Sequence, residues 1–329
     1  MLPRLIDGFG RVHNNLRISV TDRCNLRCTY CMPEEVTFLP RDELLTFEEI
    51  ARIVRVAVKL GIDKLRLTGG EPLLRRNLDR LTAMLSAIPE IKDISLTTNG
   101  LLLSEQAKAL HLAGLRRINV SLDTLRPEVF RHLTRRDGLD RILAGLESAR
   151  TIGFHPIKLN AVILRGVNDE DIVPLVRFAL ENGFEMRFIE YMPIGAEPWE
   201  RAKVFFAHEI MERIENEIGS LIPAPDYDPR SPAMEFCLAD GSGRVGIIAS
   251  VSRPFCHHCN RIRLTADGKL RNCLFALEEA DLKSVLRNGG SDEDIAEVFR
   301  ANVAAKWEGH EINTARFIKP LRTMHAIGG

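Results

Sequence analysis

Short apolar runs rich in β-branched residues alternate with amphipathic stretches over the first two-thirds of the chain. The short runs predict strands at residues 16–20, 64–68, 93–97, 117–122, 157–163 and 185–190. Amphipathic helical stretches lie between them, and six such βα units with short connections are typical of a parallel sheet. A closed eight-unit barrel would need two more units. We therefore expect an α/β fold, either a six-unit partial barrel or an open doubly wound sheet.

Helix boundaries are marked by capping residues and glycines. Thr46 and Glu49 form a capping-box pattern for a helix that stops at Gly61. Ser104 is expected to cap a helix that stops at Gly114. Further helices are expected near residues 140–151 and 171–181.

Polar residues gather where the expected strands end. The second strand runs into Thr68-Gly69-Gly70-Glu71-Pro72, and later strands end at Thr97-Thr98-Asn99-Gly100, Ser121-Leu122-Asp123 and Glu190-Tyr191-Met192-Pro193. Loops after the carboxyl ends of parallel strands build the active face of such folds. We expect Asn99, Asp123 and Glu190 to line a cavity there, without a more specific role.

The pattern changes after residue 221, which divides the chain into regions 1–221 and 222–329. The second region opens with an irregular, proline-rich connection and continues with short strand-like pieces at 244–249 and 261–265. Asp267-Gly268 predicts a hairpin between 261–265 and 270–273. Helices are expected near 280–286 and 292–302.

Composition narrows the possible functions. The formal net charge of the 329 residues is zero, which argues against nucleic-acid binding driven by bulk charge. No apolar run is long enough to span a membrane, and the first residues lack a signal-peptide core, so a cytoplasmic protein is expected. Seven cysteines in a reducing compartment favour metal binding over disulfides. Cys237 stands alone and is expected to be a buried or inert thiol.

The other cysteines form two incomplete metal-binding sets. Cys24, Cys28 and Cys31 read C-x3-C-x2-C, and Cys256, Cys259 and Cys273 read C-x2-C-x13-C. Each set has three thiols where a closed tetrahedral site needs four, so each leaves a position open for a bound molecule. Thiolates select zinc, copper(I) or iron–sulfur clusters. A zinc site remains the alternative, completed by His13 or Cys237 in the first set and by His257 or His258 in the second.

Basic residues inside expected strands point to an anionic ligand. Arg17, Arg66 and Lys158 lie within strands, where a basic side chain directed into a barrel is costly without an anion. Arg261 and Arg263 alternate along one strand and therefore share a face. The chain has no Walker A glycine loop, so basic side chains would have to bind any polyphosphate.

These motifs resemble two nested families. The first cysteine set, with Tyr30 before its last cysteine, and the run Gly69-Gly70-Glu71-Pro72 resemble the radical S-adenosylmethionine superfamily. The segments FCHHCNRIRLTADGKLRNCLF, LTTNG, INVSLDTL, KLNAVILRGVND and EYMPIG, and the final Gly328-Gly329, resemble the GTP 3′,8-cyclase family of molybdenum cofactor biosynthesis. The likeness runs in register over almost the whole chain.

The resemblance implies a fold, cofactors and a reaction. The fold would be a partial (βα)6 TIM-like barrel whose C-terminal extension carries a second iron–sulfur cluster and closes the barrel mouth. The cofactors would be two [4Fe-4S] clusters and S-adenosyl-L-methionine. A 5′-deoxyadenosyl radical would take a hydrogen from ribose C3′ of GTP, and C3′ would then bond to C8 of guanine. The implied partners are a reductant such as flavodoxin or ferredoxin, a downstream cyclic pyranopterin monophosphate synthase, and a second copy in a homodimer.

The resemblance also implies residue roles. Both cysteine sets would bind metal, and the cofactor contacts would be Tyr30, Gly70, Ser121 and Met192. The GTP contacts would be Arg17, Arg66, Thr97, Lys158, Arg261, Ile262 and Arg263, of which Arg17, Arg261 and Arg263 would be catalytic. The Gly328-Gly329 tail would reach the active site. The competing hypotheses are another two-cluster enzyme of the superfamily, such as one that acts on a peptide, and a zinc-stabilised binding module.

Overall fold

Six parallel strands form the centre of the fold, as the sequence predicts. The computed structural model describes residues 4–328. Its central strands are β3 (Asn15–Ser19), β4 (Lys64–Thr68), β5 (Asp93–Thr98), β6 (Arg117–Ser121), β7 (Ile157–Ile163) and β8 (Glu185–Glu190), hydrogen-bonded in that order. Their bounds agree with the expected strands to within one residue at each end.

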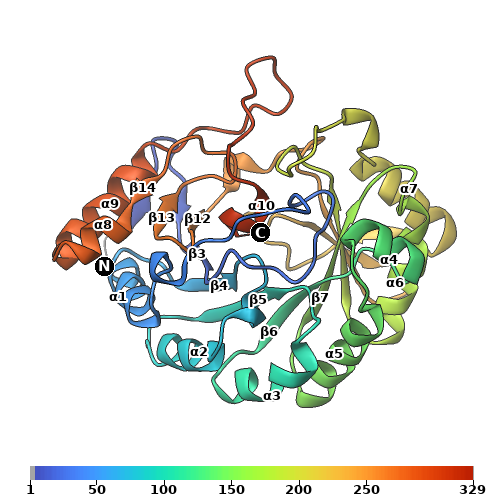
Figure 1. The fold of residues 1–329 in the computed structure, drawn as a ribbon. Helices are drawn as coiled ribbons and strands as arrows, with labels where there is room; N and C mark the ends of the chain where they lie inside the picture. The colour runs from blue at the N-terminus through green and yellow to red at the C-terminus, as the bar shows by residue number, and fades with distance from the viewer. Residues whose placement is uncertain (1–3, 329) are drawn as a thin grey trace.

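Helices that follow these strands in the sequence pack around the outside of the curled sheet (Figure 1). They are α1 (Phe47–Lys59), α2 (Leu78–Ser86), α3 (Leu103–Leu112), α4 (Pro127–Thr134), α5 (Leu139–Ile152), α6 (Ile172–Glu181) and α7 (Ala207–Glu217). Short 3-10 turns lie at Arg41–Glu43, Pro72–Leu74, Asp169–Asp171 and Arg201–Lys203. The core lies between the helices and the outward face of the strands, where residues such as Ile53, Leu67 and Phe188 are fully buried.

The C-terminal region extends the same sheet at both edges. One edge carries β11 (Arg244–Ile248), β10 (Met234–Leu238) and β9 (Leu221–Pro223), and the other carries β12 (Arg261–Leu264), β13 (Lys269–Arg271) and β14 (Ala280–Asp281). The outer helices α8 (Leu282–Arg287) and α9 (Asp292–Ala304) follow, and α10 (Met324–Ile327) lies near the centre of the ring (Figure 1). The expected hairpin is confirmed, because β12 and β13 pair antiparallel across a turn at Gly268.

Two of these C-terminal strands are parallel to the central six. β11 pairs with β8 and β12 pairs with β3, so eight parallel strands lie side by side. The two strands that a six-unit barrel lacks are therefore supplied without helices of their own. Residues 249–260 connect β11 to β12 across the opening and carry Cys256 and Cys259.

The capping predictions had different outcomes. Thr46 and Glu49 cap α1 reciprocally, with the Glu49 amide donating to Thr46 Oγ1 over 3.1 Å and the Thr46 amide donating to Glu49 Oε2 over 2.7 Å. The prediction for Ser104 is wrong, because α3 begins at Leu103 and has no side-chain cap. Leu103 is fully buried and its amide already donates to the Gly100 carbonyl, so the helix starts before Ser104.

A small antiparallel ribbon lies outside the main sheet. It consists of β1 (Leu5–Ile6) and β2 (Val12–His13). Within residues 4–328, no helix is both long and apolar enough to cross a membrane.

The two serine and threonine positions allow a matched test of the capping geometry. Thr46→Ala should lower the free energy of unfolding by about 1 kcal/mol, because the Glu49 amide loses its acceptor. Ser104→Ala should change it by less than about 0.5 kcal/mol, because this hydroxyl caps nothing. Chemical denaturation followed by circular dichroism measures both, and equal losses would contradict the assigned helix starts.

Candidate active site

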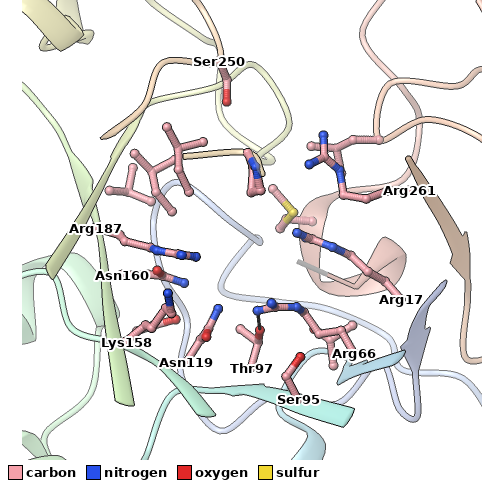
Figure 2. A pocket seen from close by; sticks show the side chains of 18 of the residues that line it. Arg17, Arg66, Ser95, Thr97, Asn119, Lys158, Asn160, Arg187, Ser250 and Arg261 are labelled. Atoms are coloured by element: carbon pink, nitrogen blue, oxygen red, sulfur yellow. Dashed lines mark hydrogen bonds between the residues drawn. The ribbon is translucent and has the colours of Figure 1, made fainter. Parts of the chain in front are cut away.

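One large cavity opens inside the curled sheet, with a volume of about 670 Å³. Residues from all eight parallel strands line it. Figure 2 shows basic and amide side chains converging on it. Both cysteine triads open into it. This volume lies within the range of small-molecule sites.

The first cysteine triad sits on a loop that follows β3. The loop is anchored to α4, since the amides of Arg27 and Thr29 each donate over 2.9 Å to the carbonyls of Thr134 and Leu133. A Cβ atom at Gly70 would lie 2.5 Å from the carbonyl oxygens of Asp22 and Arg23. Glycine is therefore required at this contact between the two motifs.

Glu71 joins that contact to the next strand. Its buried carboxylate accepts from the Thr98 hydroxyl over 2.7 Å and from the Asn99 amide over 2.6 Å. Burial outweighs these hydrogen bonds and raises the pKa of Glu71 to about 7. Asn99 in turn donates to Asn25 over 2.8 Å, beside Cys24. Glu71 thus supports the cysteine loop through Asn99, which contacts Asn25 of that loop.

Asp123 supports the same loop from the other side. Its carboxylate accepts from the Tyr30 hydroxyl over 2.6 Å and from the Val162 amide over 2.8 Å. Burial raises the pKa of Asp123 to about 6. Asn99 and Asp123 line the cavity as expected, and their hydrogen bonds identify them as supports of the cysteine loop.

Glu190 has the corresponding role for the second triad. It lines the cavity at the end of β8, and it is fully buried. Its carboxylate accepts from the amides of Ala207, Val251 and Ser252 over 2.7–2.8 Å. It also accepts from the Ser252 hydroxyl. Glu190 therefore fixes the start of the connection that leads to Cys256.

The second cysteine triad closes the opposite side of the cavity. Cys256 lies in a 3-10 turn (Cys256–His258), and Cys273 follows β13. Cys259 Sγ accepts from Arg261 Nη2 over 3.3 Å and from Lys306 Nζ over 3.4 Å. Burial opposes ionisation of Cys259, but these two cations outweigh it and lower its pKa to about 6.

The donor sets fit soft metal groups that are open to the cavity. Each triad offers three thiols, and the amide of Leu26 donates to Cys24 Sγ over 3.4 Å, as expected for a ligand thiolate. Burial raises the pKa of Cys24 to about 11 and that of Cys31 to about 12, so metal binding there must release protons.

A single zinc ion in each triad is the alternative to an iron–sulfur cluster. Among residues 4–328, no three histidine, cysteine, aspartate or glutamate side chains are arranged to hold one metal ion. A four-iron cluster distributes its ligands over several irons, so this finding concerns a mononuclear site and not a cluster. His257 and His258 are exposed, and buried His13 contacts Asp7 over 3.0 Å. These histidines and Cys237 do not line the cavity.

Four arginines lie between the two triads. Arg17, Arg66, Arg261 and Arg263 all line the cavity, and within the described chain none of them has a carboxylate partner. Burial, followed by repulsion from the other three, lowers the pKa of Arg17 well below its usual value. Burial also lowers the pKa of Arg66 to about 9 and that of Arg263 to about 10. Such a cluster is stabilised when an anion binds.

Several polar atoms of this wall lack a partner. Arg17 Nε, Arg261 Nη1 and Asn160 Oδ1 are buried and have no hydrogen-bond partner within residues 4–328. Arg66 Nη1 donates to Thr97 Oγ1 over 3.2 Å, as Figure 2 shows. Buried polar atoms are normally satisfied, so these atoms point to a polar ligand that is part of the site.

The far end of the cavity holds paired charges. Lys158 Nζ lies 2.5 Å from Glu185 and 3.6 Å from Glu235, which also pairs with Arg187. Sequence reasoning missed Arg187, although it satisfies the same criterion as Arg66, a basic residue at an inward position of a strand. Lys306 was missed too, because nothing in its local sequence distinguishes it from a surface lysine.

The remaining expected contacts fall into two groups. Tyr30, Gly70, Ser121 and Met192 line the cavity near the first triad's loop. Ile262 does not line it. It lies between Arg261 and Arg263 in the sequence of β12, and its side chain is fully buried in the hydrophobic core. Any contact between Ile262 and a ligand would therefore have to come from its backbone.

The C-terminal segment enters the cavity. Met324 and His325 of α10 line it, and the His325 ring packs edge-on against Phe38 of the first triad's loop. The Gly328 carbonyl accepts from Arg263. Gly329, the second glycine of the expected tail, lies outside the described residues.

Family models match most of the chain. The Radical SAM superfamily model matches residues 18–179, and the Molybdenum Cofactor Synthesis C model matches residues 184–312. The chain is 46% identical over 330 residues to a GTP 3′,8-cyclase of Rhodopirellula baltica, covering 99% of this chain and 92% of the relative. It is 47% identical over 328 residues to a GTP 3′,8-cyclase of Streptomyces coelicolor, covering 99% and 96% respectively.

Solved structures share the fold. The crystal structure of Streptococcus suis SuiB bound to S-adenosylmethionine superimposes with a TM-score of 0.60 at 17% sequence identity. The match covers 87% of this chain and 68% of that one. At this identity the similarity concerns the fold alone.

Because the four arginines have no carboxylate partners within the described chain, replacing one of them should increase the stability of the protein and weaken anion binding. Arg17→Met should raise the free energy of unfolding by about 1 kcal/mol, because a buried cation without a counterion is replaced by an apolar side chain. The same variant should lose most of the thermal stabilisation that inorganic tripolyphosphate gives the wild type.

Arg150→Met is the matched control, because exposed Arg150 pairs with Glu147 on α5. It should leave both quantities nearly unchanged. Thermal unfolding with and without tripolyphosphate measures the effects. A less stable Arg17→Met protein with undiminished tripolyphosphate binding would show that Arg17 is structural.

Proposed function

The chain belongs to the GTP 3′,8-cyclase family of the radical S-adenosylmethionine superfamily, and we propose that its cavity binds GTP through the arginines between the two cysteine triads. Enzymes of this family convert GTP to (8S)-3′,8-cyclo-7,8-dihydroguanosine 5′-triphosphate, the first step of molybdenum cofactor biosynthesis, and this chain is such an enzyme. When bound, the two [4Fe-4S] clusters and S-adenosylmethionine supply the electron and the 5′-deoxyadenosyl radical that removes H3′ before C3′ bonds to C8.

The observation that carries the proposed GTP site is the set of four arginines without carboxylate partners. A triphosphate carries several negative charges, and the whole chain has no net charge to attract it nonspecifically. Arg17, Arg66, Arg261 and Arg263 concentrate positive charge in a buried space where electrostatic attraction is strong. Arginine also offers paired donors to phosphate oxygens.

The two ends of the cavity suggest the orientation of the nucleotide. Arg261 contacts Cys259 and stacks over the Phe255 ring at 4.7 Å, so it belongs to the second triad's side. Lys158 lies at the other end beside Arg187. We propose that the guanine meets the second triad and that the phosphates extend past Arg66 and Thr97 toward Lys158, with backbone contact from Ile262.

The cofactor is assigned to the first triad's side. Gly70 lies directly against the cysteine loop, and it lines the cavity together with Ser121 and Met192. Together with Tyr30 they are the proposed contacts of S-adenosylmethionine, and Cys24, Cys28 and Cys31 are the proposed ligands of its cluster. Cys256, Cys259 and Cys273 are the proposed ligands of the second cluster.

The arginines would do more than bind. Arg17, Arg261 and Arg263 are proposed as catalytic residues, because they would touch the reacting nucleotide and hold its ribose between the two triads. Holding the reacting atoms close and in line supplies much of a rate enhancement. Ile327 is buried on α10 and Gly328 contacts Arg263, so the tail is proposed to exclude water from that position.

Partners and location follow from the chemistry and the family. We propose a flavodoxin or ferredoxin as the electron donor, because the reaction starts with a one-electron reduction. A cyclic pyranopterin monophosphate synthase is proposed to consume the product, and a homodimer and the division at residue 221 rest on the family likeness and the sequence pattern. Thiols that must stay reduced support a cytoplasmic location.

An anaerobic assay tests the function directly. After reconstitution with iron and sulfide, the protein with reductant, S-adenosylmethionine and GTP should form 5′-deoxyadenosine and a cyclised guanosine triphosphate. Mass spectrometry identifies both products. Deoxyadenosine without a GTP-derived product would favour another two-cluster enzyme, and a colourless protein holding two zinc ions would favour the binding module.

The second triad can be tested apart from the first. Cys256→Ser should keep the first cluster, lose about half of the iron and lose GTP conversion, because the proposed nucleotide site loses its metal. Cys237→Ser is the matched control, since half-buried Cys237 on β10 does not line the cavity. Iron analysis and the product assay measure the effect, and full turnover by Cys256→Ser would contradict the assignment.

A further inference from the structure

A short segment after α9 wraps around the second cysteine triad. Residues 306–310, which we call the collar, contact two of its cysteines. Lys306 Nζ donates to Cys259 Sγ over 3.4 Å. A Cβ atom at Gly309 would lie 3.3 Å from Cys256 Cβ, so the backbone runs close against that cysteine.

One arginine fixes the collar to the cysteine loop. Arg11, from the ribbon of β1 and β2, donates to the carbonyl of Cys256 over 2.8 Å and to that of Glu308 over 2.5 Å. It also donates to the Trp307 carbonyl over 2.6 Å. Its Nε pairs with buried Asp7 over 2.6 Å. The collar therefore keeps its position relative to the cysteines by contacts that do not depend on Lys306.

Lys306 is buried without a carboxylate. It is 5% exposed, and within residues 4–328 it forms no ion pair with aspartate or glutamate. Besides the thiol of Cys259, its ammonium group donates to the Arg261 carbonyl over 2.9 Å. Buried ammonium groups need an anion, and the anion within hydrogen-bond distance is the thiolate of Cys259.

We propose that Lys306 is a positioning residue that raises the reduction potential of the second cluster through its hydrogen bond to Cys259, an inference that rests on the proposed function. Adding one electron makes a cluster more negative, so a fixed neighbouring cation stabilises the reduced form more than the oxidised form. Hydrogen bonds to ligand sulfurs and local charge are known controls of such potentials. The hydrogen bond to the Arg261 carbonyl holds the ammonium group beside the sulfur of Cys259.

The proposal separates a redox role from a purely structural one. A lysine that only filled space would affect cluster content or protein stability when replaced, and the potential of any cluster that formed would stay the same. A lysine that stabilises the reduced cluster would change the potential according to the charge and donor that remain. Lys306→Arg keeps the positive charge and a hydrogen-bond donor. Lys306→Gln keeps a neutral donor only, and Lys306→Met removes both the charge and the donor.

The test uses full-length protein that carries the second cluster alone, obtained by changing Cys24, Cys28 and Cys31 to serine. Each variant is reconstituted anaerobically and titrated with dithionite while electron paramagnetic resonance measures the reduced cluster. Lys306→Met should lower the ratio of reduced to oxidised cluster at least tenfold at a fixed potential, or 59 mV for a one-electron couple. Lys306→Arg should stay close to the parent, and Lys306→Gln should fall between them.

A lysine far from the second triad provides the control. The other possible results would overturn either this proposal or the proposed function. Lys92→Met, which removes an exposed lysine paired with Asp63, should leave the potential unchanged. Equal potentials in the Met, Gln and Arg variants, at equal iron content, would overturn the proposal. If Lys306→Met holds no cluster, equal potentials in Lys306→Gln and Lys306→Arg would overturn it. A parent protein that binds no cluster would overturn the proposed function, and this proposal with it.

Discussion

The connection between β11 and β12 is the constraint on which the cavity depends. These two strands are neighbours in the sequence but lie at opposite edges of the eight parallel strands, so residues 249–260 must bridge the opening of the curled sheet. Glu190 holds the start of this bridge, and Arg11 holds its middle. Because Cys256 and Cys259 lie on the bridge, the same covalent link that brings the sheet edges together also places the second triad opposite the first.

The interior that this bridge encloses holds charged and polar groups that the described part of the protein does not itself pair. Barrel interiors are usually filled with apolar side chains, yet this one holds arginines that repel one another and amide oxygens without partners. Burying such groups costs free energy that must be offset by the outer core and, in the proposed complex, by the nucleotide. By contrast, both carboxylate oxygens of Glu71, Asp123 and Glu190, the supports of the two cysteine loops, accept hydrogen bonds. The residues that support the cysteine loops are therefore hydrogen-bonded within the protein, while several groups that line the cavity have no partner among the described residues.

The sequence predicts the features that depend on local pattern. All six central strands, the capping box at Thr46 and the inward direction of Arg261 and Arg263 follow from periodicity and short motifs. The start of α3 was missed because the burial of Leu103 overrides the capping preference of Ser104. The pairing of β11 with β8 and of β12 with β3 has no local signal, since it joins segments far apart in the chain. Lys306 could not be recognised either, because its importance lies in a contact made 47 residues away, with Cys259.

The contact between Arg11 and the collar has a consequence for the order in which the molecule is made. The first triad's loop has its backbone anchor on α4, at Leu133 and Thr134, so this anchor is available after less than half of the chain has left the ribosome. Arg11 must wait for Glu308, 297 residues later, before its guanidinium has all of its acceptors. Chains emerge from the N-terminus over many seconds. The contacts that fix the collar against Cys256 can therefore form only when translation is almost finished.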